Sequence, residues 1–228
     1  MRTIAFNHRR FLAGTIAAGA LVALAFGSIA SAPAASAMPD MGAAKTATTP
    51  KALALRTAMR SLWQAHGTWT ERAIVDYVGE LPDTKLVVQR LLQNQTEIGN
   101  AVKPYYGSKA GTELTKLLQE HIVDAVAVLA AAKSGDAAAI AKAKSAFYAN
   151  GDQVAGFLHS ANPDHWSLPE MRTMMRVHLN QVVGLAVAQL TGRYGAAIRL
   201  YGAYIDHLLQ MADMLSEGIV QQFPARFR

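Results

Sequence analysis

Three histidines of this sequence follow a pair of large apolar side chains at the same distance. The phrases are LWQAH, LLQEH and MMRVH, and they end at His66, His121 and His178. Each histidine lies within an apolar i, i+3, i+4, i+7 pattern, so we expect each on the buried face of a helix. Imidazole is a hydrogen-bonding group, an acid or base near neutral pH, and the commonest metal ligand. Chemistry in the core of this protein would therefore centre on these side chains.

The distances of these histidines from the predicted turns place them at one level. Antiparallel helices bring two residues level when both are equally far from the turn that joins them. The turns centre near residues 82, 135 and 193, so the mirror positions of the three histidines are about 98, 149 and 208, to within about 4 Å. The nearest polar residues are Asn94 and Gln95, Asn150, and His207. The sequence thus predicts one interior layer of His66, Asn94, His121, Asn150, His178 and His207.

Two interpretations of this layer stay open. Neutral imidazoles could pair with the two asparagines in a hydrogen-bonded packing layer, which fixes helix register at some cost in stability. Alternatively, the four histidines bind a transition metal or a haem, because such sites are built in the cores of helical bundles. The chain has no cysteine, so imidazole ligation of zinc or copper is the favoured metal chemistry. Metal binding should then be lost as the pH falls through about 6, because protonated imidazole cannot ligate.

Further side chains near the layer could assist a metal. Asp206 and Asp213 flank it and are candidate carboxylates for orienting the ligating imidazoles, although solvated helix faces explain them as well. Met174, Met175 and Met211 lie three or four residues from a layer histidine and could offer thioether sulfur. Methionine at helical spacing is also ordinary core packing.

Signatures of the common catalytic sites do not occur in the sequence. It contains no G-x-S-x-G, no H-E-x-x-H and no phosphate-binding or dinucleotide-binding glycine motif. We therefore expect a protein that binds a metal or small ligand through the buried histidines. A metal-dependent oxidase or hydrolase is the alternative, and an interaction module with merely packed histidines is a third reading.

The first 37 residues predict export. They contain three arginines and no acid, then the apolar run FLAGTIAAGALVALAFGSIA, and they end in Ala35-Ser36-Ala37. This order is typical of a secretory signal peptide, although an apolar run of this length could also be an uncleaved anchor. Residues 38–49 are small and polar and predict a flexible tether. The folded domain is expected over 50–228, periplasmic or extracellular, with no stable membrane insertion after cleavage.

The charge of the chain argues against a nucleic-acid partner. The formal net charge is +6 from 22 Lys and Arg against 16 Asp and Glu. Three of the arginines belong to the leader, so the mature chain carries only +3. Its basic residues form no stripe with interleaved aromatic side chains, which nucleic-acid binding would require. We therefore expect no nucleic acid among its partners, and a metal or small ligand instead.

Six helices are expected, at about 50–80, 84–106, 109–133, 137–160, 168–191 and 195–222. Thr49, Asp83 and Asp136 are the expected N-caps of the first, second and fourth of these helices. Alternating strand patterns are missing. Residues 93–122 also align with 149–179, which matches Asn94 to Asn150 and His121 to His178. The predicted fold is therefore an all-α, antiparallel up-and-down bundle of six helices built from helical-hairpin repeats.

Three phrases resemble a family of small exported bacterial all-helical proteins without an assigned function. They are LWQAHGTWTERAI, RLLQNQTEIGNAVKPYYGSKAGTELTKLLQEHI and MADMLSEGIVQQFP, and the resemblance covers most of residues 55–224. It implies export and a helical fold. Members sometimes carry a glycosyltransferase label, but this chain has neither an α/β sheet pattern nor an Asp-x-Asp motif. Glu71 stands where the resemblance leads us to expect arginine.

Overall fold

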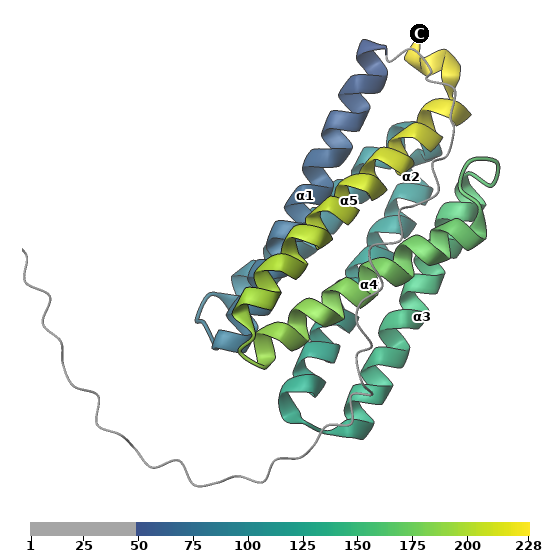
Figure 1. Ribbon diagram of the computed structural model, residues 1–228. Coiled ribbons are helices and arrows are strands. Elements are labelled where there is room, and N and C mark those ends of the chain that lie inside the picture. The colour runs from purple at the N-terminus through teal and green to yellow at the C-terminus, as the bar shows by residue number, and fades with distance from the viewer. Residues whose placement is uncertain (1–48) are drawn as a thin grey trace, which may run out of the picture. The chain divides into compact units, whose positions relative to one another are not determined.

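The structure is a computed structural model that describes residues 49–228 (Figure 1). Its regular elements within that range are all helices, with no β-strand. The elements are α1 (Pro50–Gly79), α2 (Thr84–Ser134), α3 (Ala137–Ala161), α4 (Leu168–Leu190), α5 (Tyr194–Gln222) and the short 3-10 helix η1 (Pro224–Phe227). The predicted all-α class is confirmed for this part of the chain. The predicted signal peptide, and the tether up to residue 48, lie outside the described residues.

Two of the helices begin where a side chain accepts hydrogen bonds from the free backbone amides of the first turn. The Thr49 hydroxyl accepts a hydrogen bond from the Ala52 amide at 3.2 Å, as expected for the cap before Pro50. The Asp136 carboxylate caps α3 in the same way, at 2.8 Å from the Ala138 nitrogen. Asp83, the expected cap of α2, makes no such bond and pairs instead with Arg72 of α1 at 2.9 Å.

The prediction of six helices is wrong in its count, because residues 84–134 form one element. Pro104 lies inside it, and Gly107 is its one residue with non-helical backbone angles, φ 84° and ψ 166°. Positive φ is readily adopted only by glycine, so a single residue reverses the chain without an intervening loop. The two halves of α2 then pack on each other: a Cβ on Gly99 would lie 2.5 Å from the Gly111 oxygen. The Gln119 amide also donates to Thr96 Oγ1 at 3.2 Å.

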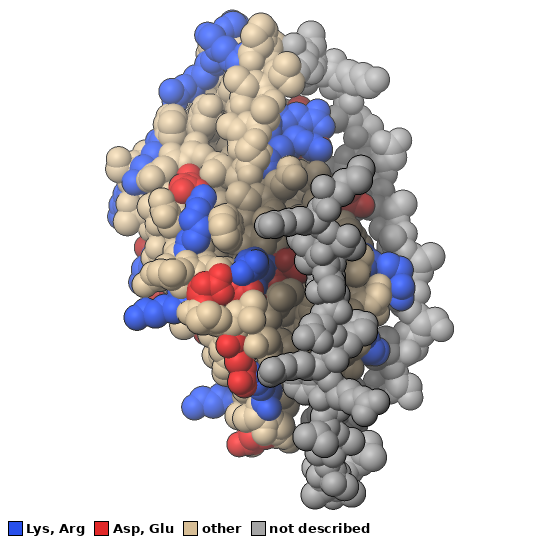
Figure 2. Space-filling view, turned by 90° about the vertical axis from the view of Figure 1, so that its left-hand side faces the viewer, with Lys and Arg blue, Asp and Glu red and all other residues tan. Residues whose placement is uncertain are grey.

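The helices pack side by side (Figure 1). Their buried apolar side chains form one large core cluster and a smaller one of Ala73, Val87, Leu91 and Ile122. α1 contacts α2 and α5, α3 contacts α2 and α4, and α4 contacts α5. None of the helices described between residues 49 and 228 combines the length and apolar character needed to span a membrane. Lys and Arg are interspersed with Asp and Glu over the face shown in Figure 2.

Candidate functional site

The structure brings the four predicted histidines together in the core. His66 comes from α1, His121 from α2, His178 from α4 and His207 from α5, and their exposed fractions are between 2% and 8%. The His178 ring is central: its centroid lies 5.7 Å from those of His66 and His121 and 6.3 Å from that of His207. We call these four residues the histidine layer. α1, α2 and α4 supply their histidines from the apolar faces that the sequence pattern predicts.

Asn150 of α3 fixes the tautomer of His121. The Asn150 side-chain nitrogen donates to the Leu117 carbonyl at 3.1 Å, so its Oδ1 faces the His121 ring. His121 Nδ1 lies 2.8 Å from that oxygen. An amide oxygen only accepts, so His121 Nδ1 carries the hydrogen and Nε2 keeps a free lone pair. Phe147 stacks on the same ring at 4.6 Å and holds its orientation.

The partner of His66 is Gln95 rather than the predicted Asn94. The Gln95 amide nitrogen donates to the Leu91 carbonyl at 2.8 Å and lies 3.1 Å from His66 Nδ1. The same nitrogen also lies 3.2 Å from Asn94 Oδ1. It carries two hydrogens and faces three atoms that can accept a hydrogen bond, so this contact does not assign the tautomer of His66. Asn94 is thus linked to His66 through Gln95, and its own amide nitrogen donates to the Leu62 carbonyl.

The remaining two histidines differ in how completely they are satisfied. His207 Nε2 donates to the Met174 carbonyl at 3.2 Å, which leaves its Nδ1 as the lone-pair nitrogen. His178 Nδ1 is buried and has no hydrogen-bond partner within the described part of the chain. Such orphaned polar atoms are rare in cores because desolvation costs about 1–3 kcal/mol when no bond replaces water. Nine other buried side-chain atoms among the described residues also lack a partner, among them Gln95 Oε1 and the hydroxyl of Tyr204, whose ring lies 5.4 Å from that of His178.

Burial keeps the imidazoles neutral. Burial, and secondarily the charge of His121, lowers the pKa of His66 to about 3. Burial lowers the pKa of His121 to about 4, although its bond to Asn150 acts in the opposite direction. The pKa of His178 is held well below 6.5, first by burial and then by the other three histidines. Burial also lowers the pKa of His207, against the effect of the Met174 carbonyl. Neutral imidazole is the form that binds metals.

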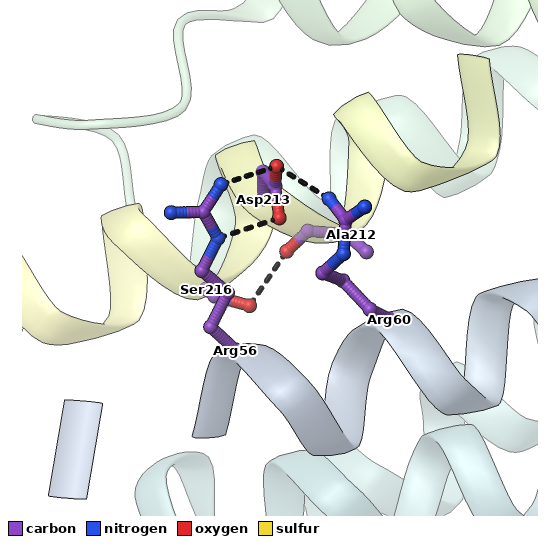
Figure 3. A network of polar contacts seen from close by, with 5 residues as sticks. All are labelled: Arg56, Arg60, Ala212, Asp213 and Ser216. Atoms are coloured by element: carbon purple, nitrogen blue, oxygen red, sulfur yellow. Dashed lines mark hydrogen bonds and ion pairs between the residues drawn. The ribbon is translucent and has the colours of Figure 1, made fainter. Parts of the chain in front are cut away.

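The two predicted carboxylates do not join the layer. Asp206 is exposed. Asp213 lies on α5 and accepts two hydrogen bonds from Arg56 of α1, at 2.8 and 2.6 Å, and one from Arg60 at 2.8 Å (Figure 3). Burial alone would raise the Asp213 pKa, but the bonds and charges of the two arginines together lower it. Asp213 therefore ties α1 to α5 near the surface.

Two small apolar cavities flank the layer along the core. One, of about 50 Å³, is lined in part by Thr70, Phe147 and Val182. The other, of about 20 Å³, is lined in part by Met59, Trp63, Trp166, Met174, Met175 and Met211, and we call it the methionine cavity. Several of its lining residues come three or four positions from a layer histidine on the same helix, which places them one turn away on the same face.

In their present conformations, the side chains of the layer offer few ligands to a single metal ion. Within residues 49–228, no group of three or more His, Cys, Asp or Glu side chains is placed so that it could hold a metal ion. Met59 and the two cavity tryptophans were missing from the site residues expected from sequence, and Gln95 was named only as a polar residue near the mirror position of His66. Gln95 was detectable as the neighbour of Asn94, and Met59 as the residue two helical turns before His66.

Comparison of the chain with protein-family models, with curated proteins and with solved structures finds no match.

Proposed function

We propose that this protein binds a transition metal inside its helical core through the histidine layer. The observation that carries the proposal is His178 Nδ1, a buried nitrogen without a partner among the described residues, on a ring surrounded by three other imidazoles. A bound metal would satisfy this atom. Two imidazoles that share one ion have ring centroids roughly 5–6 Å apart, given metal–nitrogen bonds of about 2 Å, and the separations from His178 are close to this range.

The tautomers support a ligand role for some histidines more than for others. Metal-binding histidines usually donate their second ring N–H to a carbonyl or carboxylate oxygen. His121 does so to Asn150 and His207 does so to the Met174 carbonyl. His66 Nδ1 faces the Gln95 amide nitrogen and not an oxygen, so we assign ligation to His178 with His121 or His207. His66 then acts as a packing neighbour.

Burial favours a binding protein over the alternative of a metal-dependent enzyme. An enzyme needs an open coordination position that water and substrate can reach. The layer histidines are at most 8% exposed, and the methionine cavity of about 20 Å³ has room for about one water-sized sphere. A haem does not fit in that volume. These features support a closed site for a single ion.

The experiment is metal analysis of untagged protein purified from its own compartment, followed by titration of the metal-free protein with zinc and copper. We expect wild type to hold or take up one ion and to gain thermal stability from it. His178→Ala should lose binding. His165→Ala is the matched control, because this histidine lies in the loop before α4, and it should bind like wild type. Wild type that takes up neither metal would make the layer a packing device.

Acid should release the metal at a lower pH than the sequence predicts. The expectation of about 6 follows from an unperturbed imidazole. Burial lowers the pKa of all four histidines, so the folded protein keeps neutral ligands to lower pH. We expect release only when acid begins to unfold the core.

Three broader proposals accompany this function. The helices form an antiparallel up-and-down bundle of hairpin repeats, supported by cross-helix pairs such as His121 with Asn150 and His207 with Met174. The chain is exported after cleavage behind Ala37. Its partner is a metal or small ligand and not a nucleic acid, which the interspersed charges of Figure 2 support. N-terminal sequencing of exported protein tests the second.

A further inference from the structure

We infer that the ion bound in this core is copper in its cuprous state, Cu(I), held by one or two imidazoles of the histidine layer together with thioether sulfur from the methionine cavity. This inference rests on the proposed function and names the metal and the remaining ligands. It follows from three features: the methionines beside the layer, the lack of a buried carboxylate at the layer among residues 49–228, and the low number of imidazoles available to one ion.

The methionine cavity supplies soft donors at the edge of the layer. Met174 and Met175 come four and three residues before His178, and Met211 comes four residues after His207. All three line the cavity and are at most 4% exposed. Side chains in helices lean toward the helix N-terminus, so Met211 leans toward the level of His207. Thioether sulfur selects Cu(I) over the harder divalent ions.

The electrostatics of the core favour a monovalent ion. Asp76 is the only acidic side chain that is buried among residues 49–228, and it is paired with Arg72. It lies ten residues after His66 on α1, about 15 Å along the helix at 1.5 Å per residue. Burying a charge is costly unless an opposite charge is close, and this cost rises steeply with the charge of the ion. Neutral imidazoles and thioethers therefore suit Cu(I) better than Zn²⁺.

The number of available ligands also suits Cu(I). No three His, Cys, Asp or Glu side chains within the described residues can hold one ion together, whereas structural zinc requires four protein ligands. Cu(I) accepts two or three ligands, so one or two imidazoles with one or two sulfurs complete its site. Trp63 and Trp166 also line the cavity, and an aromatic ring attracts a cation through its face.

The experiment compares Cu(I) and Zn²⁺ binding by metal-free, full-length mature protein. Cu(I) is supplied without oxygen in competition with a chromophoric Cu(I) chelator, and tryptophan fluorescence reports occupation of the cavity. The variant is the pair Met174→Leu and Met211→Leu, which conserves volume and so should preserve folding. The control is Met171→Leu, because Met171 is fully buried but does not line the cavity.

We expect wild type to bind Cu(I) more tightly than Zn²⁺, with quenching of tryptophan fluorescence. The double variant should lose at least about tenfold in Cu(I) affinity, and the control should bind like wild type. X-ray absorption of the Cu(I)-loaded wild type should show sulfur bound to copper, a measurement that needs no variant. Copper bound only by nitrogen, or unchanged affinity in a folded double variant, would refute the methionine ligands while leaving histidine binding intact. Failure of wild type to bind either ion would refute the proposed function itself.

Discussion

His178 lies at the centre of the histidine layer, and its Nδ1 is buried without a partner among the described residues. Gln95 Oε1 and the Tyr204 hydroxyl, both on residues that contact layer histidines, are unpartnered there as well. His121 and His207 each have a carbonyl acceptor that fixes which ring nitrogen carries hydrogen. The layer is therefore not a uniform set of four equivalent ligands.

Asn150 offers a test of these partners at the scale of one residue. Asn150→Ala removes both the acceptor of His121 Nδ1 and the donor to the Leu117 carbonyl. We expect a loss of about 1–3 kcal/mol in the free energy of unfolding, because the orphaned groups stay buried. Urea unfolding of the metal-free protein measures it. Asn180→Ala is the control, since Asn180 is exposed and bonds only Tyr148. An equal loss in both variants would contradict the buried network.

At the scale of the element, three glycines determine how the two halves of α2 fold back on each other. Gly107 reverses the chain with a positive φ, and the two halves approach most closely where Gly99 faces Gly111. A side chain at either position would meet backbone, which cannot move aside as the end of a flexible side chain can. The close approach lets Gln119 reach across to Thr96 and brings the α2 halves into register. His121 reaches the layer because of this register.

Two glycine-to-alanine changes should therefore have opposite signs. Gly111→Ala places a Cβ 2.5 Å from the Gly99 oxygen and also against the Lys103 side chain, so we expect a loss of about 1–3 kcal/mol from overpacking. Gly156→Ala in α3 meets no atom within 4 Å and should gain up to about 1 kcal/mol from helix propensity. Thermal unfolding of both variants measures this. Stabilisation by Gly111→Ala would show that the halves of α2 are not in tight contact.

At the scale of the whole molecule, four buried neutral imidazoles link stability to pH. Their pKa values in the folded protein are lowered from 6.5, to about 3 for His66 and about 4 for His121. Below pH 6.5 the unfolded chain binds protons that the folded chain does not, so stability falls as the pH falls toward the folded values. Asp213 affects stability only at lower pH, because its pKa in the folded protein is lowered from the ordinary value of 3.8. As the pH falls from neutral, the four histidines therefore destabilise the fold before Asp213 does.

We expect the metal-free protein to unfold between about pH 5 and 4. Each histidine contributes about 1.4 kcal/mol per pH unit, and four together up to about 5.5 kcal/mol per pH unit, against a typical total stability of about 5–15 kcal/mol. Helical circular dichroism against pH measures the transition. His207→Gln should reduce the slope of unfolding free energy against pH by about one proton. Helicity that persists below pH 4 would contradict the neutral, buried state of the layer.

The sequence by itself determined the local features of this protein. Apolar periodicity placed His66, His121 and His178 on buried helix faces, and the cap residues Thr49 and Asp136 marked two helix starts. Distances from the turns were enough to bring His207 level with His178, because the rise per residue of a helix is fixed. These features depend on neighbours within one or two turns, so a pattern in the chain reveals them.

Only the tertiary structure decided the contacts between helices. It joined two predicted helices through Gly107, gave His66 the partner Gln95, and engaged Asp213 with two arginines of α1. These contacts depend on the rotation of each helix about its axis, which follows from packing of the whole core and not from any one segment. The same packing gathers methionines and tryptophans into a cavity beside the histidines and leaves one nitrogen of His178 without a partner among the described residues.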